Sequence, residues 1–468
     1  MLTRRYMMLT GLAGLAGGVA AAKDEVAIWA QALGRPLRVL VPEGSQANIA
    51  PVKALFEAGR GCPVQIVVTD LDSINATLSI EAVTRSEQID VALPATFGIP
   101  DLAEAGAILP LDTLDAQAGG AEQIDAMLYR KGDWFDGRHW GYQTDGDIYM
   151  MFYLRDLLED PGEAARFADR HGVALKPAQD WAELDRQMAW FHRPEDGLYG
   201  GCLFRTEIYA AWEWWARFHA KGAWPFSPDM VPQIDGDAGL AALEDMIRSA
   251  AHLTGTGLGL FDNWARYKRG DIFANIGWGG TQKSLVAPGS PVRGRVLPAG
   301  LPCGARDGQR VPMSYFNWGW SYVVTRHCPV PDLAHAFARF AVSAEVSATA
   351  VAATDGYFDP FRIEHYADAR IVDTYGETFL SAHREGMKMA IPDLYLARRN
   401  EYFGALSHWL GQALTGRETP ARALRNIAES WELTTELVGR APQMARWRNL
   451  RESYPATLRD FLRDRKSG

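Results

Sequence analysis

The sequence has few cysteines and no pattern typical of a structural metal site. Its 468 residues include only Cys62, Cys202, Cys303 and Cys328. None of them belongs to a CxxC pair, and no histidine stands at zinc-finger spacing from them, which argues against a zinc site. The spacing leaves open whether the four cysteines form disulfides or remain as buried thiols.

Clustered basic residues are also missing. The net charge is −9, without a block of Lys or Arg, and this argues against nucleic-acid binding because phosphate contacts need clustered cations. Beyond residues 1–22, no run approaches the roughly 20 apolar residues of a membrane-spanning helix. No GxSxG, HExxH or nucleotide-binding loop is present, so we expect no cofactor.

Residues 1–22 are typical of an export signal. Arg4 and Arg5 precede an apolar run at 10–22 that ends in Ala20-x-Ala22, the arrangement of a signal peptide. The arginine pair resembles a twin-arginine signal, although the usual polar lysine after it is missing, so Sec export stays open. We expect a periplasmic protein.

Aromatic residues are what the sequence has in excess. It contains 16 Trp, 16 Tyr and 19 Phe within an otherwise ordinary globular composition, and its length favours two domains. Tryptophan fills cores, but its flat ring also suits sugar rings. In the helix expected at 207–221, Trp212 and Trp215 share a face, for which core packing is favoured over ligand contact.

Strands and helices alternate in the first hundred residues. We expect strands at 37–41, 64–68 and 89–93, with helices at 48–58 and up to about residue 84. This order predicts βαβ units and a mostly parallel sheet. Ligands bind at the carboxyl ends of such strands, where Gln46, Asp70 and Thr96 should lie near each other.

The segment 139–160 is the most informative. A tight polar turn at 144–147 is followed by the apolar run 148–154, which predicts a strand buried on both faces. Asp145 and Asp147 stand at its entrance. Residues two apart on a strand point the same way, so both carboxylates are candidates to face a ligand in a cleft.

Later segments continue the alternation of elements. We expect helices at 180–192, 207–221, 238–252, 332–343 and 344–354, strands at 271–276, 294–297 and 315–325, and a helical C-terminal hundred residues. Trp278 stands between Gly277 and Gly279 at a strand end, where glycines let a ligand approach the backbone.

Several motifs in order resemble family 1 of the extracellular solute-binding proteins, the sugar-binding components of ABC importers. They are IDVAL at 89–93 with LAEAGAILPLD at 102–112, GYQ at 141–143 leading to Asp147 and YLRDL at 153–157, FANIGW at 273–278, NWGW at 317–320 and DPFR at 359–362. The resemblance covers residues 36–370. The helical segment beyond is longer than it leads us to expect.

The resemblance implies an α/β, type II-like periplasmic binding protein fold. It has two hinge-linked lobes, each a mostly parallel sheet flanked by helices. Lobe one would be 36–144 and 325–370, and lobe two 145–324 and 371–468. The chain would cross between them near 144–147, 321–325 and 371.

The resemblance also implies a ligand site between the lobes. Family members that bind sugars use an Asp matching Asp147, aromatic residues matching Trp278 and one of Trp318 or Trp320, and an Arg matching Arg362. Asp145 competes with Asp147. The alternatives are turn capping for Asp147, core packing for Trp278 and a surface or interlobe salt bridge for Arg362. Of Trp318 and Trp320, we expect one in the cleft and one packed.

The function expected is capture of a sugar, oligosaccharide or polyol by a monomer that delivers it to the transmembrane subunits of an ABC permease. The alternative is a secreted glycosidase that uses paired carboxylates, for which Asp145 and Asp147 are the only close pair in a suitable context.

Overall fold

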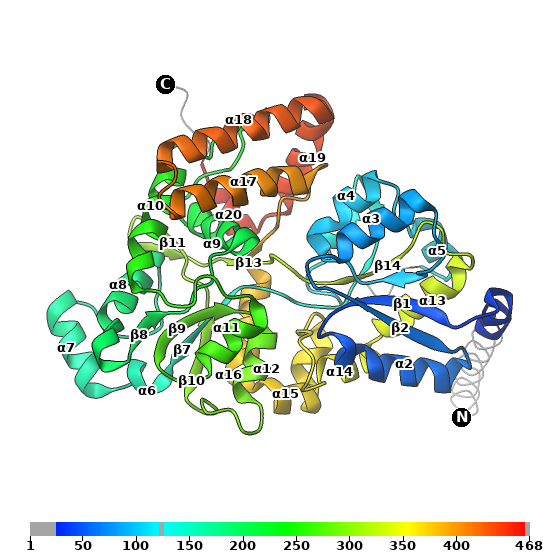
Figure 1. The fold of residues 1–468 in the computed structure, drawn as a ribbon, viewed down its shortest axis with the longest axis horizontal. Helices are drawn as coiled ribbons and strands as arrows, with labels where there is room; N and C mark the ends of the chain where they lie inside the picture. The colour runs from blue at the N-terminus through cyan, green and yellow to red at the C-terminus, as the bar shows by residue number, and fades with distance from the viewer. Residues whose placement is uncertain (1–24, 121–125, 464–468) are drawn as a thin grey trace, which may run out of the picture.

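The computed structural model describes residues 25–120 and 126–463. The expected signal peptide at 1–22 lies outside them. Two sheets, each covered by helices, lie beside one another, and the chain crosses between them more than once (Figure 1). The two-lobed α/β fold is therefore as the sequence indicates.

The first lobe contains a five-stranded sheet in the order β2-β1-β3-β14-β6. Strand β1 pairs in parallel with β2 and β3, whereas β14 runs antiparallel to both β3 and β6. The strands are β1 (Leu37–Pro42), β2 (Val64–Thr69), β3 (Val91–Ala92), β6 (Tyr142–Gln143) and β14 (Ser321–Val324). The helices around it are α2 (Gln46–Arg60), α3 (Ile74–Thr84), α4 (Ile99–Glu104), α5 (Asp112–Gln117), α13 (Pro331–Ala341) and α14 (Ala344–Val351).

The second lobe contains a four-stranded sheet in the order β10-β7-β9-β8. Its strands are β7 (Met150–Leu154), β8 (Tyr199–Gly201), β9 (Ile272–Gly277) and β10 (Val296–Gly300). Only β8 and β9 pair in parallel, because β7 runs antiparallel to β9 and to β10. The expectation of a mostly parallel sheet is thus wrong here. Strands β7 and β14 each adjoin a crossing between lobes, and each runs against its neighbours.

Strand β7 confirms the expected strand after the Asp-Gly turn. All five of its residues are buried, as a continuous apolar run predicts for a strand covered on both faces. The flanking helices are α6 (Arg155–Leu158), α7 (Pro161–His171), α8 (Trp181–Phe191), α9 (Glu207–Ala220), α10 (Asp237–Ser249), α11 (Leu260–Tyr267), α12 (Gly279–Val286), α15 (Ala369–Tyr375) and α16 (Glu377–Lys388).

Two crossings between the lobes run side by side. The segment between β6 and β7 pairs with the segment between β13 (Ser314–Tyr315) and β14 through an antiparallel bridge of Ile148 with Phe316. The expected single strand at 315–325 is therefore broken into β13 and β14. Gly319 lies in the break with φ +68°, a backbone conformation that favours glycine.

Four helices follow at the C-terminal end of the described residues. They are α17 (Arg399–Leu414), α18 (Pro420–Val438), α19 (Arg440–Ser453) and α20 (Ala456–Phe461). Helix α17 packs on α9 and α18, above the second sheet (Figure 1). Trp215 contacts Phe403 of α17 and Trp431 of α18, so core packing is the correct interpretation of this residue.

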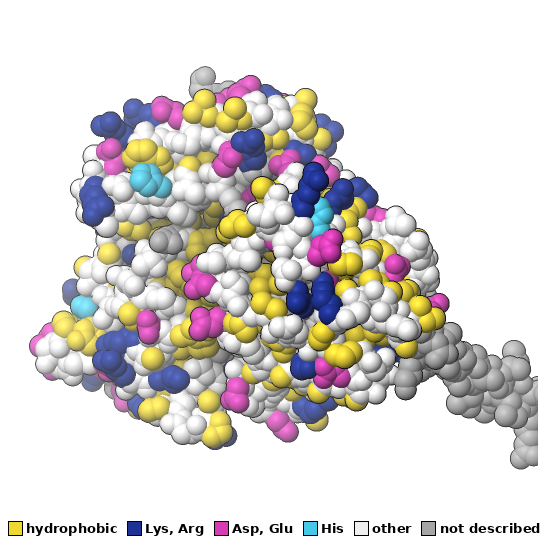
Figure 2. Space-filling model, turned by 45° about the vertical axis from the view of Figure 1, so that its right-hand side comes forward, with side chains coloured by type: hydrophobic (Ala, Val, Ile, Leu, Met, Phe, Trp, Pro, Cys, Tyr) yellow, Lys and Arg dark blue, Asp and Glu magenta, His cyan; other side chains and the backbone are white. Residues whose placement is uncertain are grey.

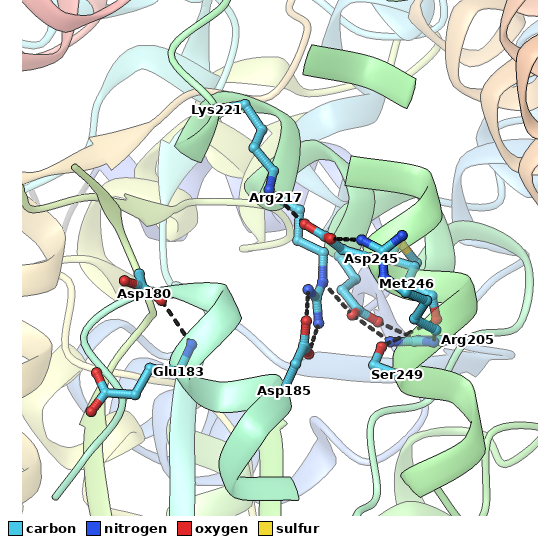
Figure 3. Close-up of polar contacts among 11 residues, drawn as sticks. Asp180, Glu183, Asp185, Arg205, Arg217, Lys221, Asp245, Met246 and Ser249 are labelled. Atoms are coloured by element: carbon cyan, nitrogen blue, oxygen red, sulfur yellow. Dashed lines mark hydrogen bonds and ion pairs between the residues drawn. The ribbon is translucent and has the colours of Figure 1, made fainter. Parts of the chain in front are cut away.

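A buried polar network holds α8, α9 and α10 together (Figure 3). The guanidinium of Arg217 bonds both oxygens of Asp185 at 2.8 Å and one oxygen of Glu213 at 2.8 Å. Arg205 bonds the same Glu213 at 2.7 and 2.8 Å. The network is internal to the second lobe.

The four cysteines are buried free thiols. No helix of the described residues combines the length and the apolar character that crossing a membrane requires.

Candidate ligand-binding site

A cleft of about 960 Å³ lies between the lobes. Figure 2 shows that the surface is hollowed at this cleft, with hydrophobic side chains inside the hollow. The first lobe contributes α3, α4 and the turn at Thr96–Gly98, and the second contributes α9, α11 and α17. The lining includes Asp70, Phe97, Tyr209, Trp212, Phe261, Trp318 and Phe403. Trp212 is fully buried, as core packing predicts, although it also borders the cleft.

A smaller pocket opens from this cleft beside the hinge. We call it the aromatic pocket, because Trp264, Trp278, Trp318, Trp320 and Tyr357 line it together with Leu71, Asp147, Leu260 and Gly280. Its volume is about 20 Å³, which accommodates a group the size of a water molecule, for which roughly 10–15 Å³ is needed. It shares Trp318 with the cleft.

The rings of the aromatic pocket pack against one another at right angles or at a tilt. The Trp278 and Trp318 centroids are 5.5 Å apart at 78°, and those of Trp318 and Trp320 are 5.8 Å apart at 44°. The Trp278 indole N–H donates to Oδ1 of Asn317 at 2.9 Å. Both Trp318 and Trp320 line the aromatic pocket, whereas Trp318 alone of the two borders the cleft and Trp320 is fully buried.

Three buried carboxylates adjoin the aromatic pocket. We call Asp145, Asp147 and Asp359 the carboxylate cluster, since oxygens of all three lie within 4.8 Å of one another. The backbone N–H of Asp359 donates to Asp145 at 2.6 Å, and that of Gly319 donates to Asp147 at 3.1 Å. The second oxygen of Asp145 is buried without a hydrogen-bond partner among the described residues.

Burial dominates the electrostatics of the carboxylate cluster. It raises the pKa of Asp145 and of Asp147 well above the usual range, and repulsion between the carboxylates adds to the effect. Burial also raises the pKa of Asp359, to about 6, against the opposing attraction of Lys283. The proximity of Asp359 raises the pKa of Asp147 further.

Helix α12 begins against this cluster. The N–H of Gly279 donates to Oδ2 of Asp359 at 2.6 Å, and a Cβ at Gly279 would lie 2.2 Å from Oδ1 of the same residue. A helix N-terminus favours a carboxylate. Gly279 therefore positions Asp359 and is absent from the walls of both cavities.

The other predicted site residues differ in whether they line the cleft. Asp70 is exposed and lines the cleft. Thr96 is buried. Its N–H donates to the carbonyl of Gly319 at 3.1 Å, and its hydroxyl donates to the carbonyl of Trp318. Thr96 thus holds the segment that carries the tryptophans.

Gln46 and Arg362 lie away from both cavities. Gln46 is the first residue of α2 and is half-buried. Arg362 is buried, and its guanidinium donates to the carbonyl of Val342 at 3.0 Å and to Glu364 at 3.1 Å. In this structure, Arg362 therefore binds within the first lobe instead of facing the cleft.

Trp264, Tyr357 and Asp359 also belong to the site, although the sequence did not single them out as site residues. Asn48, inside α2, accepts the N–H of Tyr357 at 3.0 Å and donates to the carbonyl of Ala350 at 2.8 Å, which fixes the 357–359 loop. The polar loop that follows two consecutive helices could have indicated Tyr357 and Asp359. In the sequence this loop served only as one of the motifs that resemble the family.

Comparison with known proteins gives a consistent match. The family model described as bacterial extracellular solute-binding protein matches residues 52–374. The GacH receptor of Streptomyces glaucescens, solved unliganded and with acarbose, is 18% identical over 90% of this chain and 100% of that chain, with a TM-score of 0.69. No curated protein matches the sequence.

Two further solved structures match as ABC transporter solute-binding proteins. One, from Agrobacterium vitis with bound D-mannitol, is 18% identical over 86% of this chain and 99% of that chain, with a TM-score of 0.70. The other, from Agrobacterium radiobacter in complex with ribitol, is 16% identical over the same shares, 86% and 99%, with a TM-score of 0.72. At these identities the likeness establishes the fold.

Proposed function

Because this chain belongs to the bacterial extracellular solute-binding proteins, we propose that it captures a sugar, oligosaccharide or polyol between its lobes and delivers it to the transmembrane subunits of an ABC permease. The family consists of binding receptors, so the glycosidase alternative is set aside. One observation carries the proposal: an aromatic pocket with a carboxylate in its wall opens into a cleft of about 960 Å³.

The chemistry of the walls suits a polyhydroxylated ligand. Carboxylates accept hydrogen bonds from hydroxyl groups, and aromatic faces cover the apolar side of a sugar ring. The cleft volume falls within the range of about 300–1,000 Å³ typical of small-molecule sites. The solved relatives from Agrobacterium were crystallised with polyols. Asp147, Trp278, Trp318, Trp320 and Asp70 are the proposed contacts.

Lobe closure is the proposed mechanism. Lobe one comprises 36–144 and 325–370, and lobe two comprises 145–324 and 371–468. Asp70 and Phe97 of lobe one and Trp212 of lobe two line the same cleft, so a ligand there contacts both lobes and favours the closed form. After export by the Sec or twin-arginine route and removal of residues 1–22, the monomer would act in the periplasm.

A ligand screen tests the proposal. Thermal unfolding is measured with mono-, di- and trisaccharides and polyols, and hits are titrated by calorimetry. One chemical class should raise the melting temperature, since ligand at a hundred times Kd stabilises the folded state by about 2.7 kcal/mol. If no member of any class changes the melting temperature, the proposal is wrong.

Variants connect binding to the site. Trp278→Ala and Trp318→Ala should weaken affinity for the hit at least about tenfold by removing ring contacts. The matched control is Trp134→Ala, because Trp134 is 42% exposed and lies outside both cavities. Equal affinity in the control and the two site variants would contradict the assignment, and circular dichroism verifies that each variant folds.

A further inference from the structure

Acidic side chains are concentrated where the aromatic pocket meets the hinge. The carboxylate cluster contributes three carboxyl groups, and the cation that interacts with it is the buried Lys283. The Lys283 ammonium donates to the carbonyls of Val351, the last residue of α14, and of Ala353 beyond it, at 2.6 and 3.0 Å. It is thus held by backbone carbonyls, and one positive charge faces three carboxyl groups.

The cleft around the pocket also has more acidic than basic side chains in its walls. The carboxyl groups of Glu43, Asp70, Asp72 and Asp101 line it, and Arg399 is the one Lys or Arg among the described lining residues. The Arg399 guanidinium bonds both oxygens of Asp393, at 2.8 and 2.7 Å. Its charge is therefore neutralised locally, and the cleft favours a cationic ligand.

The walls of the pocket also favour a cation. Ring faces carry negative electrostatic potential and attract an ammonium group, and five aromatic side chains line this pocket. Its volume of about 20 Å³ admits a group of water size, and a primary ammonium is of that size. A hydroxyl fits equally well by shape, so charge distinguishes the two groups.

Several buried polar atoms at the site have no hydrogen-bond partner among the described residues. The second carboxyl oxygen of Asp145 is an acceptor, and the others are donors, namely the indole N–H groups of Trp264 in the pocket wall, Trp212 in the cleft wall and Trp318 in the wall that the pocket and the cleft share. Buried polar groups are normally satisfied. A ligand with both ammonium donors and hydroxyl acceptors supplies what each atom lacks.

We propose that the ligand carries a protonated primary amine beside its hydroxyl groups, as an amino sugar or an aminated polyol does. The amine enters the aromatic pocket against Asp147, and the hydroxylated body occupies the cleft. This inference rests on the proposed function and narrows its ligand class.

Proton release accompanies such binding. Burial raises the pKa of Asp145 and Asp147, so these groups hold protons when no cation is near. An ammonium beside them favours the ionised carboxylate, and protons leave as the ligand enters. A neutral sugar gives no such release.

Matched pairs of ligands test the inference on the full-length protein by calorimetry at pH 7. The pairs are glucosamine and glucose, the glucosamine disaccharide and cellobiose, and glucamine and sorbitol. In at least one pair the amine should bind about tenfold more tightly, and its binding enthalpy should vary with the ionisation enthalpy of the buffer. High salt should reduce the preference.

Asp147→Asn separates charge from shape. It keeps the side-chain volume, so the ratio of amine affinity to neutral affinity should fall to about one and the proton release should be lost, although both ligands bind more weakly than to the wild type. Asp169→Asn, an exposed position on α7, is the control and should retain both. A preference that survives in Asp147→Asn overturns the inference.

The remaining outcomes distinguish the two proposals. If neutral members bind and amines do not bind better, the inference fails and the proposed function stands. If no member of any pair binds, both fail for these ligand classes. If calcium raises the melting temperature of the wild type but not of Asp147→Asn, the carboxylate cluster holds a metal ion, and the inference is overturned.

Discussion

The backbone N–H of Asp359 donates a hydrogen bond of 2.6 Å to Asp145, which lies 214 positions earlier in the sequence. This bond ties the loop after α14 to the first crossing between lobes. The neighbouring Asp147 accepts the N–H of Gly319 from the second crossing at 3.1 Å. The carboxylates beside the aromatic pocket therefore also join the segments of the hinge, and their charge should affect both stability and ligand binding.

Asp147→Asn should stabilise the unliganded protein while weakening ligand binding. Burial raises the pKa of Asp147 and the nearby Asp359 adds to the effect, so a neutral amide removes the cost of burying an ionisable group there. We expect the free energy of unfolding in urea to rise by about 1–3 kcal/mol and affinity for the ligand to fall. Asp169→Asn should leave both within error. A less stable Asp147→Asn protein with unchanged affinity would contradict the role given to the cluster.

Stability without ligand should fall as pH rises above 6.5. The folded state holds Asp133 with a pKa of about 7, and Asp145 and Asp147 with pKa values raised well above 3.8, all chiefly through burial. A carboxyl group whose pKa is higher in the folded state contributes stability at pH values below its pKa in the unfolded chain. This contribution is lost as the pH rises through its pKa in the folded state. The melting temperature should therefore be lower at pH 8 than at pH 6.5.

Asp145→Asn should flatten this dependence. Below pH 6.5 the buried His383, whose pKa burial lowers to about 4, acts in the opposite sense, so the comparison is made above that pH. A melting temperature equal at pH 6.5 and pH 8 in the wild type would show that the cluster does not titrate with folding.

Gly146→Ala should disrupt the hinge. A Cβ at Gly146 would lie 2.1 Å from the carbonyl oxygen of Pro360, so the first crossing and the 359–362 loop must separate. We expect a melting temperature several degrees lower and weaker ligand binding, because that separation also displaces Asp359. The control is Gly59→Ala in α2, where a Cβ meets nothing within 4 Å; it should be neutral or stabilising. Equal effects of the two substitutions would contradict the hinge contact.

Local pattern predicts much of the fold, because most elements bury one continuous apolar segment. Strands β1 and β2, helix α9 and the strand after Asp147 lie within a few residues of their expected places. The orientation of β7 could not be predicted in this way, since an apolar run specifies burial and not direction. Helix α12 was missed because its first residues, Gly279 and Gly280, are poor helix formers, and its N-terminus is instead stabilised by the contact with Asp359.

Part of the candidate site could also be predicted from local pattern. Asp147, Trp278, Trp318 and Trp320 stand in motifs beside strand ends, and they meet at one pocket. Tyr357 reaches that pocket through Asn48, 309 positions away, a contact that no local pattern contains. Arg362 fits the family motif, but the carbonyl of Val342 and the carboxylate of Glu364 bind its guanidinium inside the first lobe.

Arg217→Met should be the most destabilising of these substitutions. The guanidinium is fully buried and bonds Asp185 and Glu213 (Figure 3). It also lies 4.3 Å from the Trp181 ring centroid. Met keeps the apolar volume but leaves the Asp185 carboxylate without this partner, which for a buried pair lowers the free energy of unfolding by about 3–5 kcal/mol. Arg248→Met is the control, because that side chain is 65% exposed and its ion pair should contribute less than about 1 kcal/mol. Adding Asp185→Asn to Arg217→Met should recover part of the loss in urea unfolding, since the orphaned charge is then removed. If the double variant is as unstable as the single one, the loss comes from packing against Trp181 and not from the unpaired carboxylate.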